Sequence, residues 1–355
     1  VEFRLRNALT TGDRLGLGFP CPEIGGVEIL KAVQNHAHYQ SDIGGPNRGR
    51  GLAYGFWFGA GLPSSADLMV NSDGTVQLCS GSPDMSGTRI TLAMQAAEAL
   101  GIEPSDIFPS VGDTTSVGYS FQTVASRTTF ATGIAVYQAA QDILAQMAER
   151  AALIWQIATD NVLIDCGRFL NKANTQQCFT FKELAGKLDG TGGPIAARAL
   201  ASPEGVGFQI TAHLVDLAVD IETGKVDILR YTAFQDAGKA VHPDFVEGQI
   251  QGGTVQGIGW ALNEEYFYDE AGQLKNTSLL DYRMPTILDI PNIEAVILET
   301  PNPGHPYGVR GVGEVPIVPP AAAIANALYD AAGIRMNTLP MTPAKILDKL
   351  NSVTH

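Results

Sequence analysis

A single carboxylate, Glu314, stands in the apolar, glycine- and proline-rich segment Pro306–Pro320, just before a hydrophobic helical stretch. A carboxylate on a rigid, poorly solvated turn is destabilised in its charged form, which is the condition for general-base chemistry near neutral pH. A carboxylate at a helix start is also favoured by the helix dipole for purely structural reasons. The local sequence leaves both interpretations of Glu314 open.

A second stretch, Cys79–Thr88, is a glycine-bearing loop between a predicted strand and a predicted helix. Free backbone N–H groups at a helix start suit a phosphate or a polar heterocycle. The candidate ligand-binding residues in this loop are Gly81, Asp84, Met85, Ser86, Gly87 and Thr88. The alternative is a plain connection in which Ser86 or Thr88 caps the helix.

The third stretch, Val124–Thr129, also precedes a predicted helix. Ser126 and Thr128 can cap that helix, whereas Arg127 places a positive charge at the positive end of its dipole. A bound anion would explain Arg127, and so would an ion pair with a carboxylate of the chain.

The fourth stretch, Val246–Gly259, is rich in glycine although its pattern predicts a helix, and it also contains Gln251 and Gln256. Glycine inside a helix costs up to about 1 kcal/mol relative to alanine, so the backbone is kept thin for a neighbouring segment or for a ligand. Both explanations stay open, but a dinucleotide-binding motif is excluded because no strand directly precedes the glycines and their order is wrong.

Composition limits the remaining function classes. The 355 residues carry a formal charge of −14, which opposes binding to nucleic acid and to anionic membranes. No run of about 18 apolar residues predicts a membrane span. The histidines lack metal-ligand spacing, and we interpret the four scattered cysteines as mostly buried free thiols. The opening at Val1 suggests a piece of a longer protein or one subunit of a split protein.

These stretches must be positioned by an alternation of strands and helices in two halves. The patterns predict helices over 25–38, 87–100, 126–157, 181–188, 243–262 and 319–332, and hairpins within 66–80, 162–170, 213–235 and around 269–272, with a strand at 293–299. We therefore predict an α+β fold with antiparallel or mixed sheets and helices packed on one side. The expected parts are a leading helix and linker (1–50) and two α+β subdomains (51–195 and 196–355), divided at Gly190–Pro194.

In this order, the four stretches resemble the molybdenum-binding subunit of the xanthine dehydrogenase, aldehyde oxidase and carbon monoxide dehydrogenase family. The motif Gly311-Val-Gly313-Glu314 looks like the active-site motif of that family, and Glu247–Gly257 is similar to its pterin-binding glutamine segment. Ala125–Thr129 matches the Ser-Arg-Thr loop, and Gln235–Pro243 matches an Asp-x-Gly connection. The family loop Met-Gly-Gln-Gly is replaced here by Met85-Ser-Gly-Thr88, which lacks the glutamine.

The resemblance implies that Glu314 is the catalytic glutamate, that Gln256 bonds the pterin, and that Gln251, Gly257 and Gly313 lie at the cofactor. It implies a molybdenum hydroxylase using molybdopterin, alone or as its dinucleotide, to hydroxylate an aldehyde or N-heterocyclic carbon with water. No metal ligand is assigned to this chain. The alternative is a non-catalytic structural or cofactor-docking homologue.

The resemblance covers only the C-terminal half of a typical large subunit, so the implied partners begin with the missing N-terminal molybdenum domain or subunit. An iron–sulfur subunit and a subunit carrying FAD would accept the electrons, since this chain has no cluster cysteines. The expected compartment is the cytoplasm, with the periplasm left open.

Overall fold

The computed structural model describes residues 1–16, 18–203 and 206–353, and the chain forms two compact units. Unit 1 comprises Val1–Phe58, Phe208–Asn302 and Val312–His355, and unit 2 comprises Gly59–Gly207 and Pro303–Gly311. Both units are discontinuous in sequence, unlike the expected subdomains. The leading segment belongs to unit 1, and the glycine-rich connector at 190–194 lies inside unit 2.

Unit 1 is built on a four-stranded mixed sheet with the order β1-β9-β10-β11. Its strands are β1 (Arg48–Ala60), β9 (Val206–Val219), β10 (Val226–Asp236) and β11 (Ile293–Leu298). The predicted hairpin at 213–235 is confirmed, because β9 and β10 pair in antiparallel fashion with Tyr231 opposite Val215. The other edge of β10 pairs with β11 in parallel, with Tyr231 beside Ile293.

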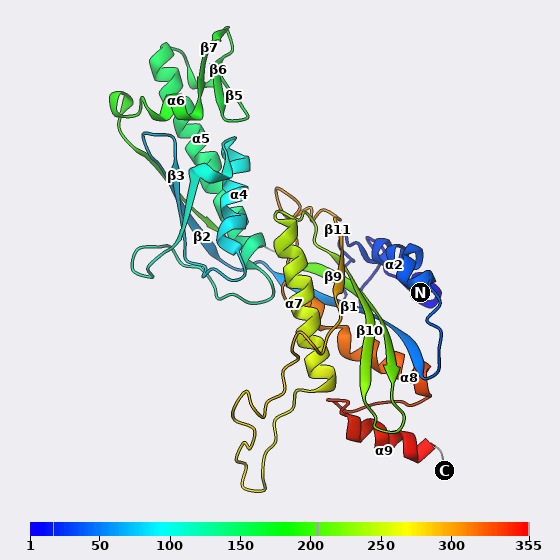
Figure 1. Ribbon diagram of the computed structural model, residues 1–355. Helices are drawn as coiled ribbons and strands as arrows, with labels where there is room; N and C mark the ends of the chain where they lie inside the picture. The colour runs from blue at the N-terminus through cyan, green and yellow to red at the C-terminus, as the bar shows by residue number, and fades with distance from the viewer. Residues whose placement is uncertain (17, 204–205, 354–355) are drawn as a thin grey trace. The chain divides into compact units, whose positions relative to one another are not determined.

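Helices cover both faces of this sheet, as can be followed in Figure 1. The glycine-rich helix α7 (Pro243–Leu262) and α8 (Pro320–Ala332) pack on the face that presents Val215 and Tyr231. Helix α2 (Gly26–Asn35) packs Ile29 and Val33 on the opposite face. The remaining helices of the unit are α1 (Glu2–Arg6), α3 (Ala37–Gln40) and α9 (Pro343–Val353).

Unit 2 contains a second mixed sheet, with the order β4-β3-β2-β8. Its strands are β2 (Ser64–Val70), β3 (Val76–Ser80), β4 (Ile107–Val111) and β8 (Ile195–Ala201). The predicted turn between β2 and β3 is confirmed: Asn71 N donates to Thr75 O, and Gly74 takes a φ of +87° that suits glycine. Helices α4 (Thr88–Leu100) and α5 (Gly133–Trp155) share one core with this sheet (Figure 1).

A small antiparallel sheet with the order β5-β6-β7 completes unit 2. Its elements are β5 (Val162–Asp165), β6 (Arg168–Asn171), β7 (Asn174–Thr180) and the following helix α6 (Phe181–Ala185). Thr180 and Glu183 form a reciprocal capping box that starts α6. The predicted hairpin at 162–170 and the helix that begins at 181 are therefore confirmed.

The α+β class with mixed sheets is confirmed, but the prediction that helices pack on one side was wrong for unit 1, where apolar residues on both faces of the sheet are covered by helices. The other differences are local. The helix predicted from residue 25 ends at Asn35, because His36 is extended and its side chain caps the short helix α3. The helix predicted from 126 begins with a π-helical turn, η2 (Thr128–Thr132), before α5. The hairpin expected around 269–272 is reduced to one bridge between Tyr268 and Leu274.

Candidate functional site

The Glu314 turn, residues 311–320, joins unit 2 back to the core of unit 1. Glu314 is half-buried and directly precedes the 3₁₀ turn η5 (Val315–Ile317), whose Val315 and Pro316 are buried. The amide of Gln235 donates from Nε2 to the carbonyl of Val312 at 3.1 Å. The sheet of unit 1 therefore contacts the turn two residues ahead of the carboxylate.

Small residues on two neighbouring elements make room for this turn. A Cβ added to Gly253 of α7 would lie 2.8 Å from Pro316 Cβ, and one added to Gly257 would lie 2.5 Å from Pro320 Cγ. A Cβ on Gly55 of β1 would lie 3.0 Å from Val318 Cγ1. By contrast, nothing lies within 4 Å of a Cβ at Gly252. Packing thus explains Gly253 and Gly257, whereas Gly252 leaves the backbone of α7 open.

The two glutamines of α7 differ in their surroundings. Gln251 is half-buried, and its Nε2 donates to Glu247 Oε1 at 3.0 Å and to Ile293 O at 3.3 Å. Gln256 is exposed, as is Gly313 beside Glu314. Five residues turn a helix through about 140° beyond a full revolution, so the two amides cannot share a face. Gln256 can reach an external ligand, whereas Gln251 ties α7 to β11.

Asp236, the aspartate of the Asp-x-Gly connection, is buried at the end of β10. Its Oδ1 accepts the N–H groups of Gly238 at 3.0 Å and Thr300 at 2.9 Å, and its Oδ2 accepts that of Gly25 at 3.1 Å. One carboxylate thereby joins three segments of unit 1 that are distant in sequence. This side chain has a structural role in the packing behind the Glu314 turn.

In unit 2, the loop at 81–88 leads into α4 and exposes the side chains of residues 83–86, whereas Ser82 is buried. Asp84, Met85 and Ser86 are exposed, and the remaining candidates, Gly81, Gly87 and Thr88, are partly buried. Ser86 and Gly87 take positive φ values of 56° and 86°. Such a φ is uncommon for serine and costs free energy, and such strain often marks functional loops.

Asp84, predicted from the sequence as a candidate ligand-binding residue and not as a cap, accepts a backbone N–H of the first turn of α4. Asp84 Oδ1 accepts the backbone N–H of Arg89 at 3.1 Å, and Oδ2 accepts Arg89 Nε at 2.9 Å. The backbone hydrogen bond from Arg89 holds the pKa of the Asp84 carboxyl below its usual value. Ser86 does not cap α4, since the N-cap is Gly87. Thr88 Oγ1 instead accepts the N–H of Met85 at 3.2 Å within the loop.

Arg127 has a different role from the two that the sequence left open. Its side chain is fully buried and donates to main-chain carbonyls and one hydroxyl, at 2.6 to 3.0 Å. The acceptors are the carbonyls of Gly61, Leu62, Pro63 and Phe121 and the Oγ of Ser64. The positive charge is therefore explained by a cluster of carbonyl dipoles, without an anion and without a carboxylate.

The neighbours of Arg127 retain features of a binding loop. Ala125 and Ser126 both take positive φ values, 52° and 51°, which L-residues rarely adopt in succession. Thr128 is buried, and its Oγ1 has no hydrogen-bond partner among the residues that the structure describes. Buried polar atoms usually have a partner, so this hydroxyl is a candidate for contact with a bound group.

The segment 303–311 joins unit 2 just before the Glu314 turn. His305 is buried against Phe130, with ring centroids 5.6 Å apart, and burial lowers the pKa of its imidazole to about 4. The hydroxyl of Tyr307 donates to the carbonyl of Gln95 at 3.2 Å. The sequence gave no indication that His305 is buried against Phe130, because this histidine is isolated in the sequence.

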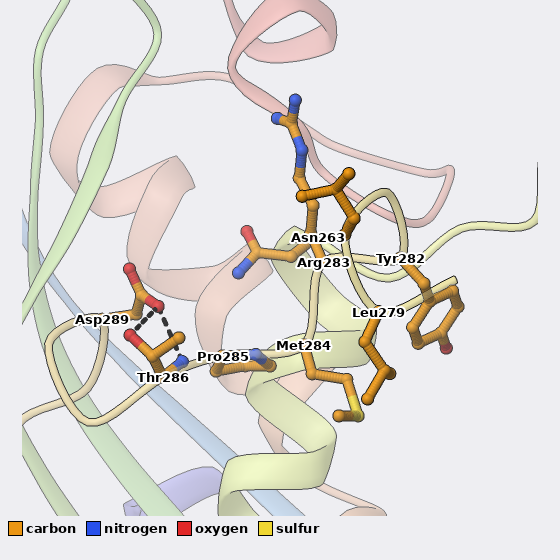
Figure 2. A pocket seen from close by; sticks show the side chains of 9 residues that line it. Asn263, Leu279, Tyr282, Arg283, Met284, Pro285, Thr286 and Asp289 are labelled. Carbon is orange, nitrogen blue, oxygen red and sulfur yellow. Dashed lines mark hydrogen bonds between the residues drawn. The ribbon is translucent and has the colours of Figure 1, made fainter. Parts of the chain in front are cut away.

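An arm without regular strands or helices, residues 263–292, extends from the end of α7 (Figure 1). It holds a pocket of about 540 Å³, lined by Leu279, Tyr282 and Met284 among others (Figure 2). Thr286 donates from N and Oγ1 to Asp289 Oδ2, each at 2.7 Å, which closes a turn beside the pocket. None of the predicted site residues lines this pocket, and the exposed apolar residues of the arm were not singled out from the sequence.

The predicted residues thus fall into two sets, each within one unit. Unit 1 holds Glu314, Gly313, Gln251, Gln256 and Gly257, and unit 2 holds the loops at 81–88 and 126–128. Unit 1 supplies a carboxylate that can accept a proton and an exposed amide. Unit 2 supplies two loops with strained backbone and, among the described residues, the unpartnered hydroxyl of Thr128. In the part of the chain that the structure describes, no helix is long and apolar enough to span a membrane, and no cluster of His, Cys, Asp or Glu could hold a metal ion.

Comparison with known proteins gives one consistent result. Residues 28–291 match the family model of the molybdopterin cofactor-binding domain. The chain is 33% identical over 378 residues to the xanthine dehydrogenase molybdenum-binding subunit of Escherichia coli O157:H7, covering 99% of this chain and 49% of that protein. It is 30% identical to the carbon monoxide dehydrogenase large chain of Afipia carboxidovorans, covering 77% of this chain and 34% of that protein.

Comparison with solved structures points to the same family. Quinoline 2-oxidoreductase from Pseudomonas putida 86 superposes with a TM-score of 0.88 at 26% identity, covering 99% of this chain and 49% of that one. The chain therefore spans about half the length of the relatives that it matches over its full extent.

Proposed function

Because the chain belongs to the molybdenum hydroxylase family as a molybdopterin-binding part of the large subunit, we propose that it carries the catalytic base of an oxidoreductase. The reaction would hydroxylate an aldehyde or an N-heterocyclic aromatic carbon with oxygen from water. The observation that carries this proposal is the Glu314 turn, in which close packing and the Gln235 hydrogen bond fix the backbone around a half-buried carboxylate.

Each unit, taken by itself, has polar groups that suit a part of molybdopterin. In unit 1, exposed Gln256 can hydrogen-bond a pterin, and the open space at Gly252 lets a ligand approach α7. In unit 2, the Thr128 hydroxyl, which has no partner among the described residues, can hydrogen-bond a polar ligand. The loop at 84–88 offers main-chain groups to a phosphate, although its cap by Asp84 already uses the N–H of Arg89. When bound, the molybdenum cofactor supplies the oxygen-transfer and two-electron redox chemistry. Arg127 would act only by shaping the loop at 125–128.

In this proposal Glu314 accepts, at a carboxylate oxygen, the proton that the attacking oxygen nucleophile loses. A general base of this kind contributes about 10²- to 10⁴-fold to a rate. The glycines of α7 and β1 let the turn pack closely on both elements, which restricts the backbone that carries the carboxylate. The cysteines that the structure describes, Cys21, Cys79, Cys166 and Cys178, are free, but only Cys21 is buried, so the expectation of mostly buried thiols was wrong. We propose that iron–sulfur and flavin partners accept the electrons.

The remaining half of the large subunit would be required for both cofactor and substrate, because each matched relative is about twice as long or longer. We expect this chain, purified without that half, to hold little molybdopterin. Stoichiometric pterin and molybdenum in the isolated chain would contradict this requirement.

A second candidate function rests on the loop at 85–88. Gly87, with a φ of +86°, stands where the family loop has its glutamine, and a glutamine would be strained there. The absent side chain favours a homologue that docks the cofactor without turnover.

Glu314→Gln in the natively purified complex distinguishes the two functions. We expect normal molybdenum and pterin content with turnover reduced at least ~100-fold. The matched control is Glu270→Gln, which removes an exposed carboxylate from the arm and should leave turnover unchanged. Full cofactor content with no turnover in the unmodified complex, or near-normal turnover of Glu314→Gln, would refute the catalytic proposal.

A further inference from the structure

We propose that Gln235 is the positioning residue of the Glu314 turn, and that Gln209 and His213 of the neighbouring strand hold its amide in place. The positioning itself is independent of the reaction, and only its catalytic consequence rests on the proposed function. Gln235 differs from Glu314 in its role. Its side chain contacts the backbone of the turn and does not contact a reacting atom.

The contact between Gln235 and the turn is direct and buried. Gln235 is completely buried at the end of β10, and its Nε2 donates to Val312 O at 3.1 Å. The next residue, Asp236, fixes the end of β10 through three backbone N–H groups. The amide that reaches the turn is therefore carried by a strand end that cannot shift freely.

The neighbouring strand presents further polar side chains to Gln235. Gln235 lies opposite Thr211, so Gln209 and His213 are its diagonal neighbours on the same face of the sheet. Gln209 is 1% exposed and His213 is 0% exposed. A row of polar groups thus lies in the core of unit 1, on the face that α7 and α8 cover.

Several atoms of this row have no hydrogen-bond partner within the described part of the chain. They are Gln209 Nε2 and Oε1, His213 Nε2 and Gln235 Oε1. Their chemistry is complementary, because a glutamine Nε2 donates, a glutamine Oε1 accepts, and a neutral imidazole nitrogen can do either. Buried groups of this kind pair with each other or through an ordered water. Such pairing would fix the Gln235 amide with its Nε2 toward Val312.

The imidazole of His213 is suited to such an uncharged network. Its Nδ1 lies 3.0 Å from Tyr231 Oη, and burial lowers the pKa of the ring to about 3. His213 is therefore neutral at pH 7 and places no charge beneath the turn. The network can orient the turn without a strong electrostatic effect on Glu314.

The test is Gln235→Met in the assembled enzyme, since methionine keeps the volume and removes the donor. We expect backbone amides of residues 311–318 to exchange hydrogen at least ~10-fold faster, and kcat to fall about 10-fold with KM and molybdenum content unchanged. The control, Thr211→Val, removes a hydroxyl that donates to Phe234 O on the same sheet and should leave exchange in 311–318 unchanged. Unchanged exchange in 311–318 for Gln235→Met would overturn the proposal, as would equal acceleration throughout unit 1.

Two further variants keep the test informative if Gln235→Met folds poorly. Gln235→Asn keeps the amide but is too short to reach Val312, so it should accelerate exchange in the same segment. Gln209→Met should do so more weakly, and its effect should not add to that of Gln235→Met, because both act through one network. Full additivity of the two changes would remove Gln209 from the network.

The exchange measurement separates this inference from the proposed function. If Gln235→Met loosens the turn while Glu314→Gln retains normal turnover, the positioning role stands and the catalytic assignment fails. If Glu314→Gln abolishes turnover while exchange in 311–318 is unaffected by Gln235→Met, the catalytic assignment stands and the positioning role fails.

Discussion

The Glu314 turn of unit 1 and the Arg127 loop of unit 2 are both short irregular segments, but they are held by opposite means. The turn is held by close packing against glycines of α7 and β1 and by one uncharged amide. The loop is held by a single buried guanidinium that donates to carbonyls of two chain segments, residues 61–63 and Phe121. The first arrangement should therefore be sensitive to added volume, and the second to the loss of one side chain.

The largest effect on stability that we expect is that of Arg127→Met. The change leaves several buried carbonyls without a donor, and each such group costs about 1–3 kcal/mol. We predict that unit 2 of the cofactor-free protein loses about 4 kcal/mol in its free energy of unfolding. Urea unfolding followed by the fluorescence of Trp155, in a background with Trp57 and Trp260 replaced by Phe, measures this unit.

Arg89→Met is the control, because Arg89 makes a partly exposed ion pair with Asp84. Exposed pairs contribute about 1 kcal/mol or less. If both arginine variants destabilised unit 2 equally, the buried hydrogen bonds of Arg127 would contribute no more to stability than a surface ion pair, which would contradict this prediction.

In contrast, the stability of the Glu314 turn in unit 1 should depend on the volume of the side chains that pack against it. Gly257→Ala places a methyl group against the Pro320 ring, so we predict a loss of about 3 kcal/mol, the upper range for overpacking. Gly252→Ala on the same helix meets nothing within 4 Å and should stabilise unit 1 by about 0.5–1 kcal/mol through helix propensity. Urea unfolding monitored in a Trp155→Phe background measures unit 1. Equal effects of the two changes would show that packing does not hold the turn.

The local elements could be predicted from the sequence, since turn residues and hydrophobic periods act over short distances. The β2–β3 turn and the starts of α4 and α6 are examples. The environment of Arg127 could not be predicted, because its acceptors at 61–64 lie more than sixty residues away. The unfavourable position of its charge at the start of a helix correctly indicated that Arg127 has a compensating partner. That partner is a set of main-chain carbonyls and not an anion.

The same limit applies to the candidate site. Glu314 stands out locally as the one carboxylate of its segment, whereas the role of Gln235 depends on a contact with Val312, seventy-seven residues later. The glycines of α7 were recognised as unusual, but only the fold separates those that pack on the turn from those that leave the backbone open. The assignment of the cofactor-binding residues stays a prediction.

Low pH should lower the free energy of unfolding of both units, because each unit contains a buried histidine. The pKa of His213 in unit 1 is lowered to about 3 and that of His305 in unit 2 to about 4, each by burial. An unfolded histidine takes up a proton near pH 6.5, so the unfolded state binds more protons below that pH. Each histidine therefore contributes stability that is present above pH 6.5 and lost as the pH falls toward the folded pKa.

We predict that each unit loses about 2 kcal/mol between pH 7 and pH 5 from its histidine. His213→Leu should flatten the pH dependence of unit 1 alone, and His305→Leu that of unit 2 alone. Unfolding free energies at both pH values, followed by the unit-specific tryptophans, test this. If either variant flattened both units equally, the effect would not come from local burial.

The smallest effect on stability is expected at Asp84→Asn. Asp84 caps α4 from an exposed loop, and the substitution keeps an oxygen acceptor for the Arg89 N–H. We predict a change of about 0.5 kcal/mol or less in the stability of unit 2, with molybdopterin retention in the complex reduced. Unchanged retention would show that the loop at 81–88 is only a connection.

The return of residues 303–311 to unit 2 has a consequence for biosynthesis. A ribosome has already released most of unit 2 when Gly207 emerges, yet Phe130 and Gln95 still lack their partners His305 and Tyr307. That unit therefore cannot reach its final packing until much of unit 1 has been translated. The Glu314 turn, which directly follows the returning segment, is therefore among the last parts of the site to form.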